Sequence, residues 1–305
     1  MSRLSFRRHL TGRPPARHTW WVPELPEVEA LSLFLGERTE GAIVERVDVV
    51  AVSALKTFSP SPDELCGRTM QSVGRRGKFL VMATDGPSLV VHLARVGWIR
   101  WRDVPAGRPK PGRGPLALRV TLDRGEFDVT EAGTQKKVAV YVVERPEDVP
   151  GVASLGVDPL SSEFTADRLA ALLGSTRQQL KGALTDQSLV AGVGNAYSDE
   201  ALHAARLSPF KAASSLTPEE VESLHTAILS VLADAVGRSA GLPAAGLKSE
   251  KRSGMRVHGR TGEGCPVCGE KIRQVAFADR SLQYCPGCQT GGKVLADRRL
   301  SRLLK

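Results

Sequence analysis

The chain has 305 residues, a length that suits about two domains of ~100–200 residues each. Hydrophobic residues make up 41% and charged residues 25%, which excludes a mostly disordered chain, a collagen-like fibre and a disulfide-stapled miniprotein. The formal net charge is +9, but the first 22 residues hold five arginines and no acidic residue, so the remainder carries only +4. The mildly basic charge of residues 23–305 is compatible with a polyanionic partner but does not require one.

The apolar residues do not form a membrane-spanning pattern. The longest apolar run, residues 89–99, is interrupted by His92 and Arg95 and falls short of the ~20 residues that a transmembrane helix needs. Residues 1–22 are rich in arginine, lack the apolar core of a secretory signal and show no periodicity. We interpret residues 1–22 as a disordered extension or a misplaced start, and we expect no membrane partner.

The sequence of residues 23–146 predicts one helix followed by short strands. Pro26 suits the first turn of a helix over residues 25–35, in which the apolar side chains share one face. The turn signal at residues 123–125 predicts a hairpin. The regular spacing of the β-rich runs predicts a β-sandwich in an N-terminal domain of residues 23–146. These runs are residues 79–82, 89–93, 116–122 and 138–143.

After residue 146 the pattern becomes helical. A helical domain is predicted over residues 147–245, then a Gly-, Lys- and Arg-rich linker at 246–264, a small separate unit at 265–290 and a basic tail at 291–305. The expected fold class is therefore α+β, with several domains. The expected helices of the second domain span residues 165–173, 177–184, 196–205 and 218–236.

Four of the five cysteines follow the spacing of a zinc site. Cys265 and Cys268 form one C-x-x-C pair, and Cys285 and Cys288 form a second pair after sixteen residues. An odd cysteine count with paired spacing indicates intracellular metal binding and not a disulfide framework. Four thiolates complete a tetrahedron, so we predict one structural Zn²⁺. Arg280 lies between the pairs, where it serves as a phosphate contact or simply as a solvated surface residue.

Two further segments are ambiguous when taken alone. Residues 192–200 open a predicted helix after a Gly-Val-Gly turn, so backbone N–H groups face an anion there or Asn195 merely caps the helix. Residues 22–29 contain two prolines and three carboxylates, which in isolation mark a helix start.

Four blocks in this order resemble the Fpg/Nei family, which comprises formamidopyrimidine-DNA glycosylase and endonuclease VIII. The resemblance covers residues 23–289 and implies an N-terminal helix with a β-sandwich, a helix-two-turn-helix domain and a C-terminal zinc-ribbon hairpin. It implies a bifunctional DNA glycosylase/AP lyase of base excision repair. The expected partner is double-stranded DNA with damaged or abasic sites, and the protein is expected to be a cytoplasmic, nucleoid-associated monomer. The four blocks are Pro23–Glu29, Arg75–Leu80, Asp186–Leu202 and Cys265–Cys288.

The resemblance also implies roles for individual residues. Pro23 would be the nucleophile, Glu24 the acid/base at the deoxyribose ring oxygen, and Glu27 a supporting carboxylate. Lys78 would bind phosphates beside the lesion. The expected contacts with the DNA backbone are Asn195, Arg280 and His92.

An N-terminal proline suits this chemistry. An α-amino group has a pKa near ~8, so roughly 10% is free amine at pH 7, against about 0.04% for a lysine. A secondary amine that attacks C1′ yields an iminium without an N–H proton to lose, which stays cationic and draws electrons for phosphate elimination. Base release and strand cleavage thus follow from one covalent intermediate.

The chain departs from the family where the lesion is read. Arg95 stands where the guanine-lesion branch has its wedge methionine, and residues 128–134 replace the segment that carries that branch's Arg-Phe pair. A short segment at 246–254 replaces the long capping loop. The resemblance therefore does not extend to 8-oxoguanine as the substrate.

Pro23 itself follows Val22 and is an amide in the printed chain. Val22 can be encoded by GUG, which also initiates translation as methionine, and removal of that residue would expose Pro23. The alternative is a non-catalytic, zinc-stabilised DNA-binding relative that uses Lys78, Asn195 and Arg280 but lacks a free proline. A zinc-ribbon protein-interaction module is a third hypothesis, and it predicts no salt-dependent affinity for duplex DNA.

Overall fold

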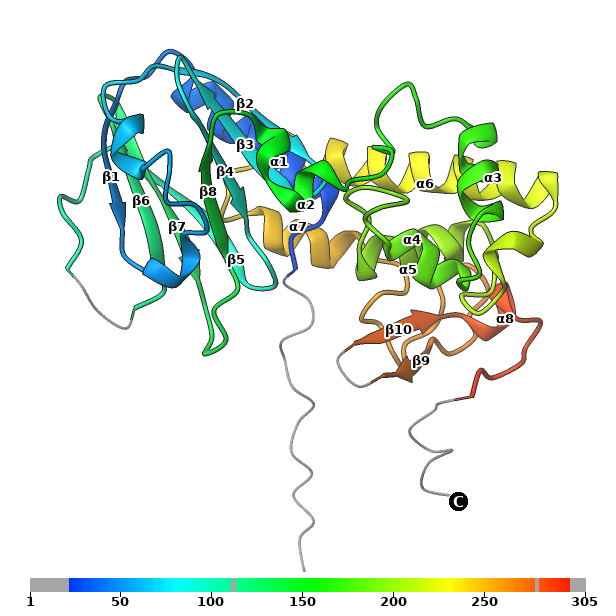
Figure 1. Cartoon of the computed structure of the whole chain (residues 1–305). Helices are drawn as coiled ribbons and strands as arrows, with labels where there is room; N and C mark the ends of the chain where they lie inside the picture. Colours follow the sequence, from blue (N-terminus) through cyan, green and yellow to red (C-terminus); the bar gives the residue numbers. More distant parts are fainter. Residues whose placement is uncertain (1–21, 111–113, 278–279, 297–305) are drawn as a thin grey trace, which may run out of the picture.

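The computed structural model describes residues 22–110, 114–277 and 280–296, so the extension before Val22 and the end of the predicted basic tail lie outside it. A β-rich half and a helical half lie side by side, and the chain crosses between them after β8 (Figure 1). Among the described residues, no helix combines the length and the apolar character that a membrane crossing needs.

The β-rich half is a sandwich of two four-stranded antiparallel sheets, as predicted. Phe127, Leu80 and Met82 are fully buried between the sheets. One sheet has the order β1 (Val44–Val49), β6 (Leu116–Leu122), β7 (Gly125–Glu131) and β5 (Gly97–Arg102). The other has the order β2 (Met70–Arg76), β3 (Phe79–Thr84), β4 (Ser88–His92) and β8 (Ala139–Val143).

Helix α1 (Leu25–Thr39) closes the sandwich against β2 and β3. Its apolar side chains Val28, Leu31 and Leu35 are fully buried in the sandwich core, as the helical period of the sequence predicts. Short helical turns connect the strands and helices elsewhere. These are the 3₁₀ turns Val52–Ala54, Pro62–Leu65, Pro146–Asp148 and Ala213–Ser215, and α2 (Pro150–Ala153).

The helical half contains the four predicted helices. The longest, α6, begins with a capping box in which the Thr217 hydroxyl accepts from the Glu220 N–H and the Glu220 carboxylate accepts from the Thr217 N–H. Leu224, Ile228 and Leu232 of α6 pack into the core of this half. The helices are α3 (Ala166–Gly174), α4 (Leu180–Thr185), α5 (Asn195–Ala204) and α6 (Pro218–Ser239).

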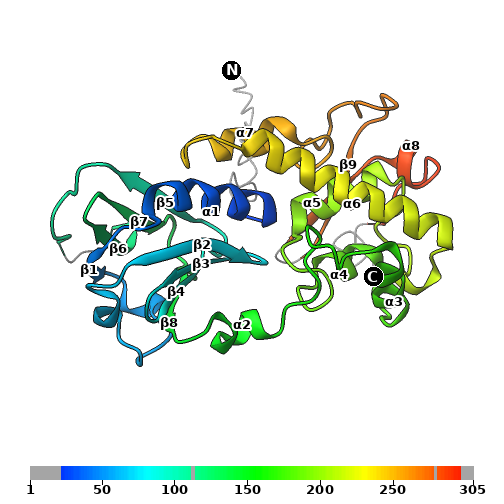
Figure 2. The same ribbon diagram turned by 90° about the horizontal axis from the view of Figure 1, so that it is seen from above.

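The predicted linker at residues 246–264 is wrong in its first part, because α7 (Leu247–Gly254) forms there. Leu247 is fully buried in the sandwich core, and the Trp98 indole N–H donates to the Ala244 carbonyl at 2.9 Å. Helices α6 and α7 run beside α1 (Figure 2). Charged residues and glycines dominate the segment, so its composition hid a helix that tertiary packing stabilises.

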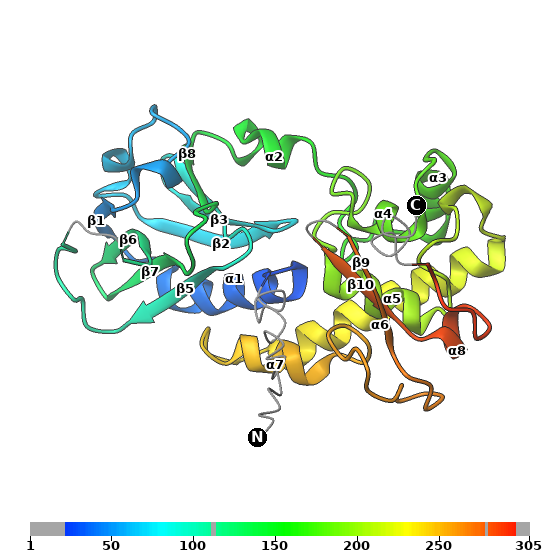
Figure 3. The same ribbon diagram turned by 90° about the horizontal axis from the view of Figure 1, so that it is seen from below.

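The predicted zinc unit is a hairpin of β9 (Arg273–Ala276) and β10 (Ser281–Tyr284) followed by α8 (Pro286–Gln289), but it is not separate. It packs against α5 (Figure 3). The buried Glu200 carboxylate accepts from three successive backbone N–H groups at residues 256–258. The Asp199 carboxylate accepts from the Gln283 N–H at 3.1 Å and bonds to His258 at 2.7 Å. Helix α5 therefore fixes where the hairpin lies.

A buried ion-pair cluster holds the two halves together. The Arg75 side chain is 6% exposed and donates to both carboxylate oxygens of Asp158, at 2.5 and 3.1 Å, and to Glu29 at 2.5 Å. These contacts join β2, α1 and the segment that follows β8. A planar guanidinium suits such two-point pairing, and it joins the two halves close to the start of α1.

Candidate active site and DNA-binding face

The Glu24 carboxylate lies at the N-terminus of α5. Its two oxygens accept from the backbone N–H groups of Ala196 at 2.9 Å and Tyr197 at 3.2 Å. The first N–H groups of a helix have no partner within the helix and favour an anion. The sequence left open whether the Gly-Val-Gly turn binds a phosphate, and the structure shows that its helix receives this carboxylate from the other half of the chain.

Gly194 permits this close approach. A Cβ at Gly194 would lie 2.4 Å from Cδ of Glu24, a distance that atoms do not adopt. The Leu25 N–H donates to the Gly192 carbonyl at 3.0 Å, and Gly192 has a φ of +84°. The turn therefore needs glycine at residue 192 for its backbone and at residue 194 for the space that Glu24 occupies.

Glu27 joins the start of α1 to α5 and α7. One Glu27 oxygen accepts from the Tyr197 hydroxyl at 2.6 Å, and the other accepts from the Glu24 N–H and the Lys251 ammonium, both at 2.8 Å. All four side chains are buried. The structure thus gives the predicted supporting carboxylate a partner on each of two helices.

The charges around Glu24 keep it ionised. Burial by itself raises the pKa of this carboxyl. The ammonium groups of Lys251 and Lys78 and the Ala196 N–H have the larger combined effect and lower the pKa to about 2. Lys78 lies in the tight turn between β2 and β3, and burial lowers its own pKa. Glu24 is therefore a carboxylate at neutral pH, available to accept a proton.

His92 is at the end of β4 and stacks on Phe79, with ring centroids 4.7 Å apart. Burial and the charge of Lys78 lower its pKa to about 4, so the ring is neutral at pH 7. A neutral imidazole donates one hydrogen bond to a DNA phosphate but adds no charge to the interaction.

Asn195 and Arg280 both line one pocket of about 250 Å³. The Asn195 amide donates to the Ser281 carbonyl at 2.7 Å, which links the start of α5 to β10. Lys181 on α4 lines the same pocket, where its ammonium bonds to Asp199 at 2.6 Å and to the Asn195 carbonyl at 2.5 Å. The pocket combines an exposed guanidinium, an amide and a partly buried ammonium, which are donors suited to an anion.

The turn that carries Arg95 lies beside the segment expected near the wedge, because Gly97 pairs with Glu131 and the Ala132 N–H donates to the Val96 carbonyl. Arg95 is exposed in the turn between β4 and β5, next to Ala94 with a φ of +53°. Asp128 is buried within β7 in an ion pair with Arg119 at 2.7 Å. The Glu131 carboxylate is buried and accepts from the backbone N–H of Val138 at 3.1 Å. Asp128 and Glu131 therefore stabilise the sandwich and are not presented to DNA.

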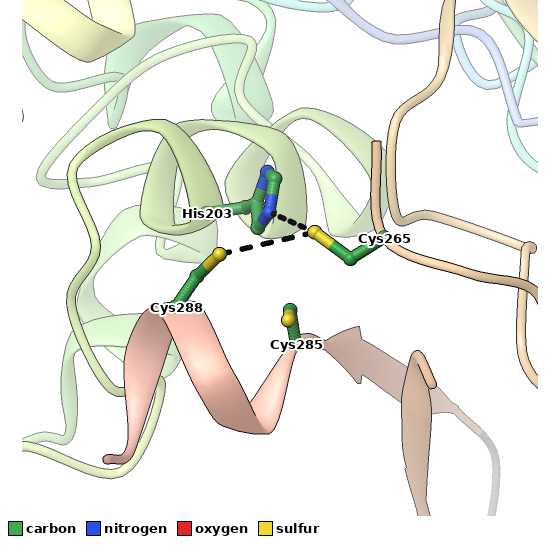
Figure 4. A group of neighbouring side chains, drawn as sticks. All are labelled: His203, Cys265, Cys285 and Cys288. Carbon is green, nitrogen blue, oxygen red and sulfur yellow. Dashed lines mark hydrogen bonds between the residues drawn. The ribbon is translucent and has the colours of Figure 1, made fainter. Parts of the chain in front are cut away.

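Three of the four ribbon cysteines, Cys265, Cys285 and Cys288, converge with one histidine, His203 (Figure 4). The Sγ atoms of Cys265 and Cys288 are 3.8 Å apart, and those of Cys268 and Cys285 are 3.3 Å apart. A tetrahedral zinc with Zn–S bonds of ~2.3 Å separates its thiolates by about 3.8 Å, so the donor set fits this ion.

His203 of α5 is buried, and its Nε2 lies 3.2 Å from Sγ of Cys265. The sequence analysis missed it because the histidine lies 62 residues before that cysteine. Its Nε2 falls within 4.8 Å of the Sγ atoms of Cys265, Cys285 and Cys288. The ribbon therefore carries a Cys/His cluster suited to a structural metal.

A β-sandwich, a helical domain whose helix N-terminus holds a carboxylate, and a zinc ribbon beside it together define a class of DNA-binding repair proteins. The family models agree domain by domain. Residues 22–137 match the formamidopyrimidine-DNA glycosylase N-terminal domain, residues 155–243 match its H2TH domain, and residues 262–291 match the zinc finger found in FPG and IleRS.

The chain belongs to the formamidopyrimidine-DNA glycosylase family. It is 37% identical over 292 residues to the formamidopyrimidine-DNA glycosylase of Symbiobacterium thermophilum, covering 91% of this chain and 93% of that protein. An uncharacterized formamidopyrimidine-DNA glycosylase-like protein of Mycobacterium tuberculosis is 57% identical over 156 residues, covering 51% of this chain and 98% of that protein.

Solved structures agree with this assignment. The MutM (Fpg) protein of Thermus thermophilus superposes with a TM-score of 0.76 at 32% identity, covering 89% of this chain and all of that one. A complex between Lactococcus lactis Fpg and abasic-site DNA gives a TM-score of 0.77 at 28% identity, covering 88% of this chain and 99% of the other. The predicted family and fold class are confirmed.

The sequence analysis did not single out two lysines of the site, Lys251, which is buried, and Lys181, which is partly buried. Lys251 lies in the segment predicted to be a linker, where a lysine suggests solvent exposure. Lys181 follows the buried Leu180 in the short helix α4, and a single lysine in such a helix gives no sequence signal of a site.

Proposed function

We propose that this chain is a bifunctional DNA glycosylase/AP lyase whose active form begins at Pro23. The observation that carries the proposal is the Glu24 carboxylate, fixed and ionised at the N-terminus of α5 directly beside Pro23. The family model begins at residue 22, which supports a functional start at Pro23. Pro23 is buried at the point where the two halves meet, a suitable place for a nucleotide turned out of the duplex.

The chemical steps follow from these positions. The lone pair of the Pro23 nitrogen attacks C1′ of the deoxyribose, and the damaged base leaves with the electrons of the glycosidic bond. The nitrogen then carries a proton that Glu24 accepts, because this carboxyl is ionised at neutral pH. Protonated Glu24 returns the proton to the ring oxygen as the C1′–O4′ bond breaks, which yields the iminium. Loss of a C2′ proton then expels the 3′ phosphate and nicks the strand.

The remaining residues bind DNA or hold the fold. Lys78, Asn195 and Arg280 contact phosphates around the lesion, with His92 and Arg95 as further contacts, and Glu27 orients Glu24 through its backbone N–H. Cys265, Cys268, Cys285 and Cys288 would hold one structural zinc ion, which would keep the hairpin carrying Arg280 in place. The partner is duplex DNA with damaged or abasic sites.

Borohydride trapping tests the proposal directly. Protein that begins at Pro23 is expected to form a covalent adduct with abasic-site duplex, because reduction fixes the iminium. Protein that begins at Met1 should form none, because its Pro23 nitrogen is an amide. Equal trapping by the two forms would identify another nucleophile. Salt-sensitive binding to abasic-site DNA without trapping by either form would favour the non-catalytic DNA-binding relative.

The lesion preference gives a further prediction. Arg95 is exposed where an apolar wedge is expected, and residues 128–134 contain neither arginine nor phenylalanine, so the contacts expected to read an oxidised guanine are missing. Each lost contact is worth about 1–3 kcal/mol. Single-turnover cleavage of abasic sites should therefore exceed excision of 8-oxoguanine opposite cytosine by about 10²-fold or more. Similar rates on the two duplexes would show that other residues supply the wedge.

A further inference from the structure

The buried ammonium of Lys251, from α7, lies at the start of helix α1. Lys251 is 9% exposed, and its Nζ donates to Oε2 of Glu27 at 2.8 Å and to the Val22 carbonyl at 2.9 Å. The same Nζ lies 3.7 Å from Oε1 of Glu24 and 4.9 Å from the centroid of the Tyr197 ring. Lys251 thus has three oxygen neighbours, and one of them belongs to the residue before Pro23.

The Val22 contact places Lys251 beside the Pro23 nitrogen. The carbonyl oxygen and the nitrogen of one amide are about 2.2 Å apart, so Nζ lies within about 5 Å of that nitrogen. In a chain that begins at Pro23 this carbonyl is absent. The ammonium then keeps Glu27 and Glu24 as its oxygen neighbours.

We propose that Lys251 is a positioning residue of the reaction, which balances the carboxylates of Glu24 and Glu27 so that the Pro23 amine is unprotonated near neutral pH. The inference rests on the proposed function. Two buried carboxylates without Lys251 would draw a proton onto the nearest amine, because an opposite charge within ~4–6 Å favours the charged form. A protonated amine has no lone pair with which to attack C1′.

The other charges around the amine support this balance. Glu24 and Glu27 come from α1, Lys78 from the turn between β2 and β3, and Tyr197 from α5. Burial by itself lowers the pKa of Lys251. Glu24 and Glu27 have the larger combined effect and raise this pKa, so the ammonium stays charged. Burial raises the pKa of Tyr197 well above its usual value, so this hydroxyl is neutral. More distant charges that act on these groups are Lys181, His258 and Arg238.

The segment that carries Lys251 is rigidly held. Leu247 is buried in the sandwich core, and Glu250 accepts from Arg238 of α6 at 2.7 Å. Lys251 therefore reaches the site from a helix whose first turn is held by both halves of the molecule.

The test compares the pH dependence of borohydride trapping on preformed abasic-site DNA, with protein that begins at Pro23. In Lys251→Met the acidic limb should move up by about one pH unit, because the carboxylates then stabilise the protonated amine. The trapping rate should fall about tenfold at pH 6.5 and recover by pH 9. Lys251→Arg keeps the charge and should keep the midpoint. Lys248→Met changes a lysine of the same helix whose ammonium lies over Trp98, and it should leave the profile unaltered.

Two results would overturn the inference. One is a Lys251→Met profile with the original midpoint and a uniformly lower rate, which indicates structural support alone. The other, independent of whether that variant folds, is a ¹⁵N NMR titration of the unsubstituted protein in which the Pro23 amine has a pKa at or above the ordinary ~8. Absence of trapping by the unsubstituted protein at every pH would instead refute the proposed function.

Discussion

Replacing Glu24 by glutamine is expected to lower single-turnover base excision by about 10²–10⁴-fold, the range that a positioned acid or base contributes. The amide has nearly the same shape and keeps an oxygen for the Ala196 N–H, but it no longer accepts the proton of the Pro23 nitrogen or returns it to the sugar. Trapping on a preformed abasic site should fall less, because the base has already left. Excision and trapping rates measured on protein that begins at Pro23 separate the two steps.

Glu37→Gln is the matched control, because it makes the same chemical change on α1 at a side chain that is 71% exposed. It should leave both rates unchanged. Excision by Glu24→Gln within threefold of the unsubstituted protein would contradict the assigned role.

The Glu24→Gln substitution also changes how the stability of the fold depends on acidic pH. The ionised Glu24 carboxylate stabilises the fold above pH 4.5, and this stabilisation is lost as the pH falls toward its folded-state pKa of about 2. Glu24→Gln has no such carboxylate, so its free energy of unfolding should fall less over this pH range.

Replacing Cys285 by serine is expected to release zinc and to weaken binding to abasic-site duplex by 10²-fold or more. The described residues of the ribbon form two small apolar clusters, one of them built from three of the cysteines with Val257 and Ile272, so the metal supplies much of its folding energy. Loss of the hairpin removes Arg280 and the Ser281 carbonyl that orients Asn195. Zinc content and a binding isotherm at fixed salt measure both effects.

Cys66→Ser provides the control, because Cys66 is exposed on the sandwich and far from the ribbon. It should alter neither zinc content nor affinity. The unfolding transition of the sandwich should persist in Cys285→Ser, since its core contains no residue of the zinc ribbon. Full DNA affinity in a variant that binds no zinc would refute the role given to the ribbon.

The sequence by itself determined the family, the fold class and most of the elements, because each depends on local order. The C-x-x-C pairs, the Pro-Glu start of α1 and the Gly-Val-Gly turn are contiguous motifs whose residue types impose their local geometry. The alternation of the strands and the capping box at Thr217 are equally local. These signals place Pro23, Glu24, Lys78 and Asn195 in recognisable blocks without any knowledge of what surrounds them.

Only the tertiary structure decided which groups share the site. Glu24 meets the N-terminus of α5 from 172 residues away, and Lys251 meets Glu27 across 224 residues. His203 reaches Cys265 from another domain. No local pattern marks such pairs, because burial of a lysine or a histidine depends on charges and carbonyls that the fold brings near it. The same reason explains α7: its charged sequence indicates a linker, and the helix forms because Leu247 enters the core while Lys251 neutralises two buried carboxylates.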